Sequence, residues 1–150
     1  MTQAETIYAD IPGGPELMAW FGEVPRFHDA EIVSLTINRR APSILRLHNW
    51  TMRLEEGPPR RITLDNHAVV TFTLEDIVDL QLDGFSHQNV IFRLALTRAP
   101  DRPDRKPFYT ASSPDDYEIQ LEPCFGLNGL IRCRKVSVSF IPGKPEDARA

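Results

Sequence analysis

Apolar and polar side chains alternate with a period of two along most of this chain. In the segment 69–74, Val70, Phe72 and Leu74 alternate with valine and threonine. The same alternation recurs in the segments 33–38, 78–83, 90–97 and 117–122. This period is typical of strands that bury one face and expose the other. We therefore expect a mainly β fold of the α+β class, with about seven strands that are mostly antiparallel.

Two segments break this period. In the first, the apolar positions change from odd to even numbers at His48 and Asn49, and in the second the change falls between Cys133 and Val136. One extra residue in a strand turns every later side chain to the opposite face. A β-bulge, or a strand that changes layers, would have this effect. We therefore predict a curved sheet, built as a sandwich or a half-open barrel.

The rest of the chain fits one domain. A length of 150 residues suits a single core. Pro15 at a first-turn position and Gly22 at a stop position predict one short amino-terminal helix between them. We expect a single domain over residues 1–150, with flexible ends at about 1–12 and 143–150 and a proline-rich loop at 98–116.

The charge and hydropathy of the chain argue against two classes of protein, general nucleic-acid binders and membrane proteins. The formal net charge of −4 argues against a general nucleic-acid binder, which usually carries a basic surface. We find no stretch of transmembrane length and no signal-peptide pattern, so we expect a cytoplasmic protein without a membrane partner. Charge alternates in blocks along the chain. Such blocks either pair across neighbouring strands or form a polar face that steers a charged partner.

The two cysteines lie near a predicted turn. Asn128-Gly129 is a strong signal for a two-residue hairpin, and a turn there would place Cys124 directly opposite Cys133. That geometry permits a disulfide, whereas a reducing cytosol opposes one. We expect two reduced, packed thiols. A redox-dependent bridge and, less readily, a metal site are the alternatives.

The sequence "PRFHDAEI" at 25–32 places His28 beside Asp29. The pair could act as acid and base or as metal ligands, but adjacent strand residues point to opposite faces, so a shared site requires a turn. The structural interpretation is that Asp29 caps backbone N–H groups, His28 donates to a carbonyl and Phe27 enters the core. Similarly, the amides of Gln88 and Asn89 are expected to bond loop backbone groups.

Four segments, taken in order, resemble the bacterial immunity protein 50 family. They are "FGEVPRFHDAEIVSLTI", "HAVVTFTL", "LQLDGFSHQNVIFRLAL" and "CFGLNGLIRCRKVSVSFIP". The family's second motif has an aromatic-Asn pair where this chain has Phe85-Ser86-His87, which leaves the role of position 86 open. The resemblance assigns the motif residues mainly to maintenance of the fold. These are Phe27, His28, Asp29, Glu31, Phe85, Gln88, Asn89, Gly126 and Gly129.

The resemblance also implies a function. Family members are expected to bind a protein toxin from competing bacteria and to neutralise it by stoichiometric occlusion, without catalysis and without a cofactor or metal. Partner contacts in such proteins usually lie on variable loops and exposed faces. The candidates here are Asp79, Asp83, Arg102, Arg105, Tyr109, Asp115 and Asp116.

Other classes of function fit the residues too. A small β-domain could bind a ligand or a metal, or could act as a weak hydrolase with His28, Asp29 and His87 brought together by loops. A third alternative is a scaffold subunit that forms a homodimer through an exposed sheet edge.

Overall fold

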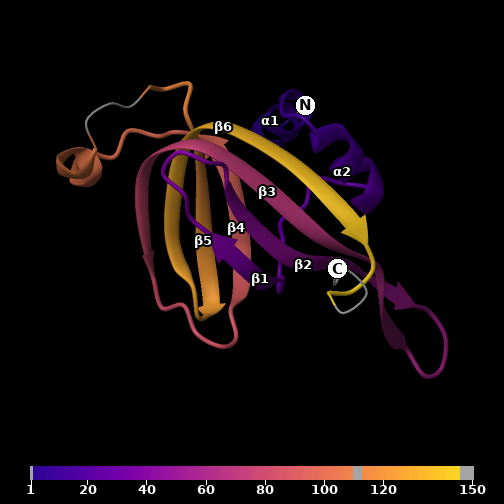
Figure 1. Cartoon of the computed structure of the whole chain (residues 1–150). Coiled ribbons are helices and arrows are strands. Elements are labelled where there is room, and N and C mark those ends of the chain that lie inside the picture. Colours follow the sequence, from indigo (N-terminus) through magenta and orange to yellow (C-terminus); the bar gives the residue numbers. More distant parts are fainter. Residues whose placement is uncertain (1, 110–112, 146–150) are drawn as a thin grey trace.

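Antiparallel strands form a closed barrel in the computed structural model, which describes residues 2–109 and 113–145 (Figure 1). The order around the barrel is β1-β2-β3-β6-β5-β4. The six strands of the described residues are β1 (Glu31–Thr36), β2 (Ser43–Glu55), β3 (Arg61–Asp83), β4 (Val90–Arg98), β5 (Tyr117–Phe125) and β6 (Asn128–Pro142). The expectation of a mainly β, antiparallel and curved sheet is confirmed.

The strand count differs from the sequence expectation because β3 is continuous. The segments 69–74 and 78–83, which the alternation separates, belong to one strand of 23 residues. A register shift between Ile77 and Asp79 turns the later residues without ending the strand. As a result Asp79 is buried and Leu80 is exposed, the reverse of the predicted alternation.

Both predicted changes of phase occur. The pairing of β2 with β3 shifts between Asn49 and Thr51, close to the predicted position. In β6, Arg134 and Lys135 are both exposed, between buried Cys133 and buried Val136. These irregularities let long strands curve around a small barrel.

The interior of the barrel is apolar and holds the core. Inward-facing side chains of every strand contribute to it, including Leu45, Leu47, Phe72, Ile91 and Ile131, all of which are fully buried. Burial of these side chains supplies the main stabilising free energy of such a fold.

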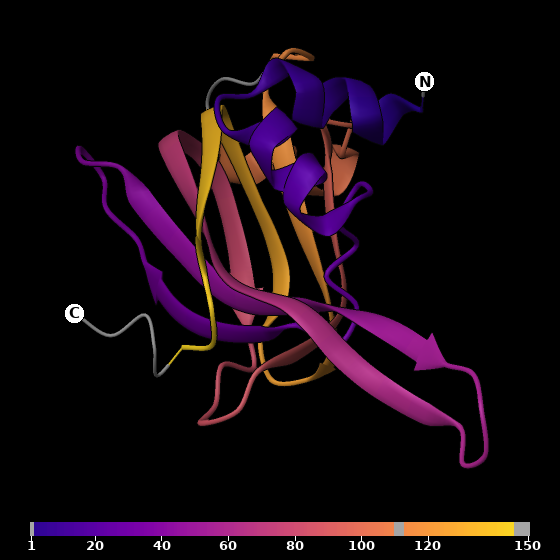
Figure 2. The same cartoon turned by 90° about the vertical axis from the view of Figure 1, so that its right-hand side faces the viewer.

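Two short helices pack beside the barrel (Figure 2). Helix α2 (Gly14–Phe21) confirms the predicted helix, and Gly22 ends it in the left-handed conformation. Helix α1 (Gln3–Asp10) was not expected, since it falls in the range predicted as a flexible end. Its Thr2–Glu5 capping box and buried Ile7 and Tyr8 explain its formation.

The predictions for the chain ends and for the proline-rich loop concern segments that the structure describes only in part. Among the described residues, no helix has both the length and the apolar character that crossing a membrane requires. Residues 1, 110–112 and 146–150, which belong to the predicted ends and the proline-rich loop, lie outside the described residues. The described part of that loop contains a 3-10 helix, η1 (Pro103–Phe108).

Strands β2 and β3 extend beyond the barrel as a two-stranded ribbon, which we call the arm (residues 51–65; Figures 1 and 2). In the described part of the chain, no third strand pairs with the arm. Both of its edges are therefore open, and its side chains are exposed or partly exposed.

Candidate interaction surface

The turn formed by "PRFHD" joins α2 to β1 and has an unusual backbone. Phe27 and Asp29 both have positive φ, at 60° and 63°. The Phe27 side chain is buried and packs edge to face on Phe72, with ring centroids 5.7 Å apart. The Asp29 N–H donates to the Ile91 carbonyl at 3.0 Å. The predicted turn with Phe27 in the core is confirmed, and its strained backbone is held by β4.

His28 projects outward from this turn. Its Nδ1–H donates to the Phe92 carbonyl at 3.2 Å, as the sequence interpretation expects. Its Nε2 lies 3.4 Å from the Asp29 carboxylate, and both side chains are about half exposed. Among the described residues, the Asp29 carboxylate therefore contacts His28 and not a backbone N–H group, which corrects the predicted cap.

A hollow of about 550 Å³ opens beside His28. We define the hollow by its lining residues Phe21, His28, Trp50, Met52, Phe92 and Arg93. Phe92 is exposed and stacks edge to face on His28, with centroids 5.2 Å apart. The hollow therefore combines aromatic walls with polar and charged side chains, which besides His28 and Arg93 include Glu23, Arg26, Asn49 and Thr51.

One face of the arm is apolar. Met52 lies opposite Leu64, and Leu54 lies opposite Ile62, so the four side chains share one face of the ribbon. Their exposed fractions are 61%, 46%, 59% and 66%, respectively. Exposed aliphatic side chains that gather in this way indicate a binding surface, whereas single ones do not.

The other face of the arm is polar. It carries three cross-strand pairs, Thr51 with Asp65, Arg53 with Thr63 and Glu55 with Arg61. The arm is therefore an amphipathic ribbon. After the change of phase the apolar positions are Trp50, Met52 and Leu54, and Met52 and Leu54 are exposed because β2 leaves the barrel after its register shift. In the sequence, the apolar residues on both sides of "EEGPPRR" were the signal that could have indicated this amphipathic ribbon.

Polar contacts fix the base of the arm. The Trp20 indole N–H donates to the Asn66 carbonyl at 3.0 Å, and the Asn66 amide donates to the Trp20 carbonyl at 3.2 Å. Beside them, His48 and His67 share a ring-nitrogen hydrogen bond of 3.0 Å. These contacts tie the arm to α2 and orient it next to the hollow.

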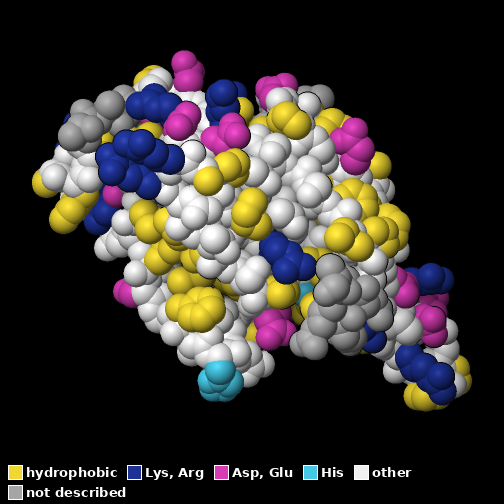
Figure 3. Space-filling view, viewed as in Figure 1, with side chains coloured by type: hydrophobic (Ala, Val, Ile, Leu, Met, Phe, Trp, Pro, Cys, Tyr) yellow, Lys and Arg dark blue, Asp and Glu magenta, His cyan; other side chains and the backbone are white. Residues whose placement is uncertain are grey.

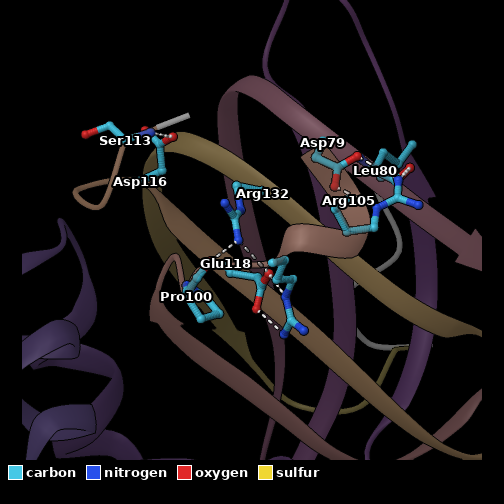
Figure 4. Close-up of polar contacts among 9 residues, drawn as sticks. Asp79, Leu80, Pro100, Arg105, Ser113, Asp116, Glu118 and Arg132 are labelled. Carbon is cyan, nitrogen blue, oxygen red and sulfur yellow. Dashed lines mark hydrogen bonds and ion pairs between the residues drawn. The ribbon is translucent and has the colours of Figure 1, made fainter. Parts of the chain in front are cut away.

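Several predicted partner contacts instead form buried polar contacts within the chain (Figure 4). Arg105 of η1 donates two hydrogen bonds to Asp79, of 2.9 and 2.8 Å. Both side chains are buried. Asp116 is buried as well and accepts a bond from the Ser113 N–H. The expectation that these three residues face a partner is wrong, because each neutralises or bonds a group within the chain.

Glu118, which was not among the predicted site residues, forms a separate buried cluster with two arginines. It accepts two hydrogen bonds from Arg102, of 2.6 and 2.7 Å, and one from Arg132 at 3.3 Å. Arg132 also donates to the Pro100 carbonyl. The alternation along β5 predicts that Glu118 faces outward. Its side chain is nevertheless buried, because a loop covers it (Figure 4).

The other predicted contacts do not form one surface. Asp83 and Asp115 are exposed, and Arg102 and Tyr109 are partly exposed. Asp83 ends β3, whereas the other three belong to the loop that contains η1, at the other end of the barrel in Figure 1. A role of these four residues in binding stays a prediction.

The Asp79–Arg105 pair should make stability depend on pH. Its hydrogen bonds hold the pKa of Asp79 below the ordinary value. A lowered folded-state pKa means that this stabilisation is present above the unfolded-state pKa of about 3.9 and is lost as the pH falls through the lower, folded-state value. In urea unfolding, Asp79→Asn should therefore be much less stable than the wild type at neutral pH and nearly equal to it in acid. A difference that does not change with pH would contradict this origin.

The motif near 85–89 fixes a loop. The buried Asn89 side chain accepts from the backbone N–H groups of Ser86 and Leu127, at 2.9 and 3.0 Å, and donates to the Ser86 carbonyl. The expectation that this amide bonds the loop backbone is confirmed. Gly126 lies against Asn89, with no room for a side chain. Phe85 and Gln88 are exposed.

Hydrogen bonds and ion pairs do not join the described residues of the hydrolase and metal alternatives into one site. Among the described residues, no hydrogen bond or ion pair joins His87 to His28 or Asp29. Within the same residues, no group of three His, Cys, Asp or Glu side chains could hold a metal ion.

The two cysteines are not paired. Cys133 lies opposite Tyr117 in β5 and Ile77 in β3, so the predicted alignment with Cys124 is wrong. The hairpin turn forms at Gly126 and Leu127, and Asn128-Gly129 belongs to β6. Cys124 is exposed, whereas Cys133 is buried.

The difference in exposure between the two cysteines predicts that Cys124 is the reactive thiol of the native protein. Burial, together with nearby Asp116, raises the pKa of Cys133 to about 12. Because the thiolate is the reactive form, an aromatic disulfide reagent at neutral pH should modify Cys124 in the native protein and Cys133 only after denaturation. Cys124→Ser should remove the native reaction. Equal rates for both thiols would contradict the burial of Cys133.

Comparison with known proteins gives one match. A family model described as Immunity protein 50 matches residues 15–130, which include the turn, the hollow and the arm. The comparisons with curated proteins and with solved structures give no match.

Proposed function

This chain belongs to the immunity protein 50 family, and we propose that it is a non-catalytic immunity protein that neutralises a cognate toxin by stoichiometric binding. The match over residues 15–130 is the observation that carries this proposal. Toxin binding would occlude or distort the toxin's active site. We place this activity in the cytoplasm of a bacterium that would otherwise be poisoned.

The geometry supports a binding role over a catalytic one. His28 and Asp29 hold a turn, and the titratable side chains of the Asp79 and Glu118 clusters neutralise arginines. Polar groups used in this way stabilise a rigid scaffold, on which exposed segments can present a recognition surface.

A pull-down from lysate of the source organism tests the proposal. The tagged full chain should retain one stoichiometric partner that carries a toxin domain, identified by mass spectrometry. The purified partner should lose its activity when the chain is added. A partner whose activity is unaffected would contradict the proposal, and a protein retained alone would direct attention to small ligands of the hollow.

A further inference from the structure

We infer that the apolar face of the arm and the adjoining hollow together form the surface on which the toxin docks. The inference rests on the proposed function and adds the place and the chemistry of binding. Met52 connects the two parts, since it lines the hollow and also belongs to the apolar face. The surface is therefore continuous from the aromatic residues beside His28 to Leu54 and Ile62 near the tip.

The charges of the arm indicate what kind of surface it meets. Three arginines (53, 60 and 61) balance three acidic residues (Glu55, Glu56 and Asp65), although the whole chain has a net charge of −4. Figure 3 shows side chains of both signs together with hydrophobic ones on the projecting arm, at the lower right. The complementary toxin surface is accordingly apolar at its centre, with a rim of both charge signs. Such an interface loses little affinity as salt increases.

The available area favours a toxin over a second copy of this chain. Four half-exposed aliphatic side chains present on the order of 400 Å². Two arms packed face to face would thus bury about 800 Å² in total, which is less than specific complexes bury. A convex toxin segment that fills the hollow and also covers the arm would bury more of this surface than a second arm packed on the apolar face alone.

A matched pair of double variants tests this assignment. Leu54→Glu/Ile62→Lys replaces one cross-strand pair of the apolar face with an ion pair, which keeps the ribbon paired and the net charge unchanged. Glu55→Lys/Arg61→Glu places the same two residue types as an ion pair on the polar face, one position away and also without a change in net charge. The probe is the purified toxin recovered in the pull-down, and its Kd is measured by calorimetry at low and at high salt.

The expected result is a loss of affinity of at least about 30-fold for Leu54→Glu/Ile62→Lys, and a change of less than about threefold for the polar-face control. If the two double variants bind the toxin with equal affinity, the inference is overturned, while the proposed function stays intact. A wild-type dimer in sedimentation that becomes monomeric in the apolar-face variant without loss of toxin binding would also overturn the inference. If the wild type does not inhibit any recovered toxin, the proposed function fails, and the inference fails with it.

Discussion

Replacing Glu118 with glutamine is expected to lower the free energy of unfolding by about 3–5 kcal/mol. The Glu118 carboxylate is buried between Arg102 and Arg132, and Arg132 is itself almost fully buried. Glutamine preserves the shape of the side chain but removes the negative charge. A buried guanidinium then keeps its desolvation cost without the attraction that offsets it. Urea unfolding followed by tryptophan fluorescence and circular dichroism measures the change.

Glu122 provides the control for this prediction. It lies on the same strand and bonds Arg93, but both side chains are substantially exposed to solvent. Water and salt screen such pairs, so Glu122→Gln should change the free energy of unfolding by less than about 1 kcal/mol. Equal effects of the two substitutions would show that Glu118 is not buried as described.

Gly129→Ala should destabilise the fold by about 3 kcal/mol or more, or prevent folding. A Cβ atom at this position would lie 1.8 Å from the Gln81 carbonyl oxygen, and φ is 143°. Gly129 pairs with Leu82 of β3 and with Leu121 of β5, so backbone approaches it from both sides. Thermal and urea unfolding of the variant measure this loss.

A substitution at Gly22 measures the free-energy cost of the backbone angle without the cost of a steric contact. Its φ is 76°, yet a Cβ atom added there would meet no other atom within 4 Å. Gly22→Ala should therefore cost only about 1–2 kcal/mol, from the left-handed conformation alone. If Asn128-Gly129 formed the exposed hairpin turn that the sequence predicts, Gly129→Ala would be as mild as Gly22→Ala.

The sequence predicts an antiparallel, curved sheet because periodicity reports which strand faces are buried, whereas closure into a full barrel goes beyond the predicted sandwich or half-open barrel. Val70, Phe72 and Leu74 alternate as expected in the middle of β3, where both neighbouring strands are in place. The hairpin signal at Asn128-Gly129 failed because local turn preference yielded to long-range pairing with β3. Register between distant strands depends on tertiary contacts, which turn statistics do not include.

The candidate site was only partly predictable for the same reason. The structural role of Phe27 and His28 follows from local chemistry, and both side chains lie as that role requires. Asp79 and Arg105 are 26 residues apart, and their pairing requires the loop to fold back over the barrel. Likewise, periodicity indicates that Met52 and Leu54 share a face, but it does not reveal that β2 has left the barrel at that point.

Titration of toxin activity with the purified chain tests the central claim most directly. If the chain neutralises its toxin by occlusion, activity should fall linearly and reach its minimum at one equivalent, and dissociation of the complex should restore it. Inactivation by a small fraction of an equivalent that increases with time would contradict the claim, because it would require turnover. Full toxin activity at several equivalents would contradict the immunity function itself.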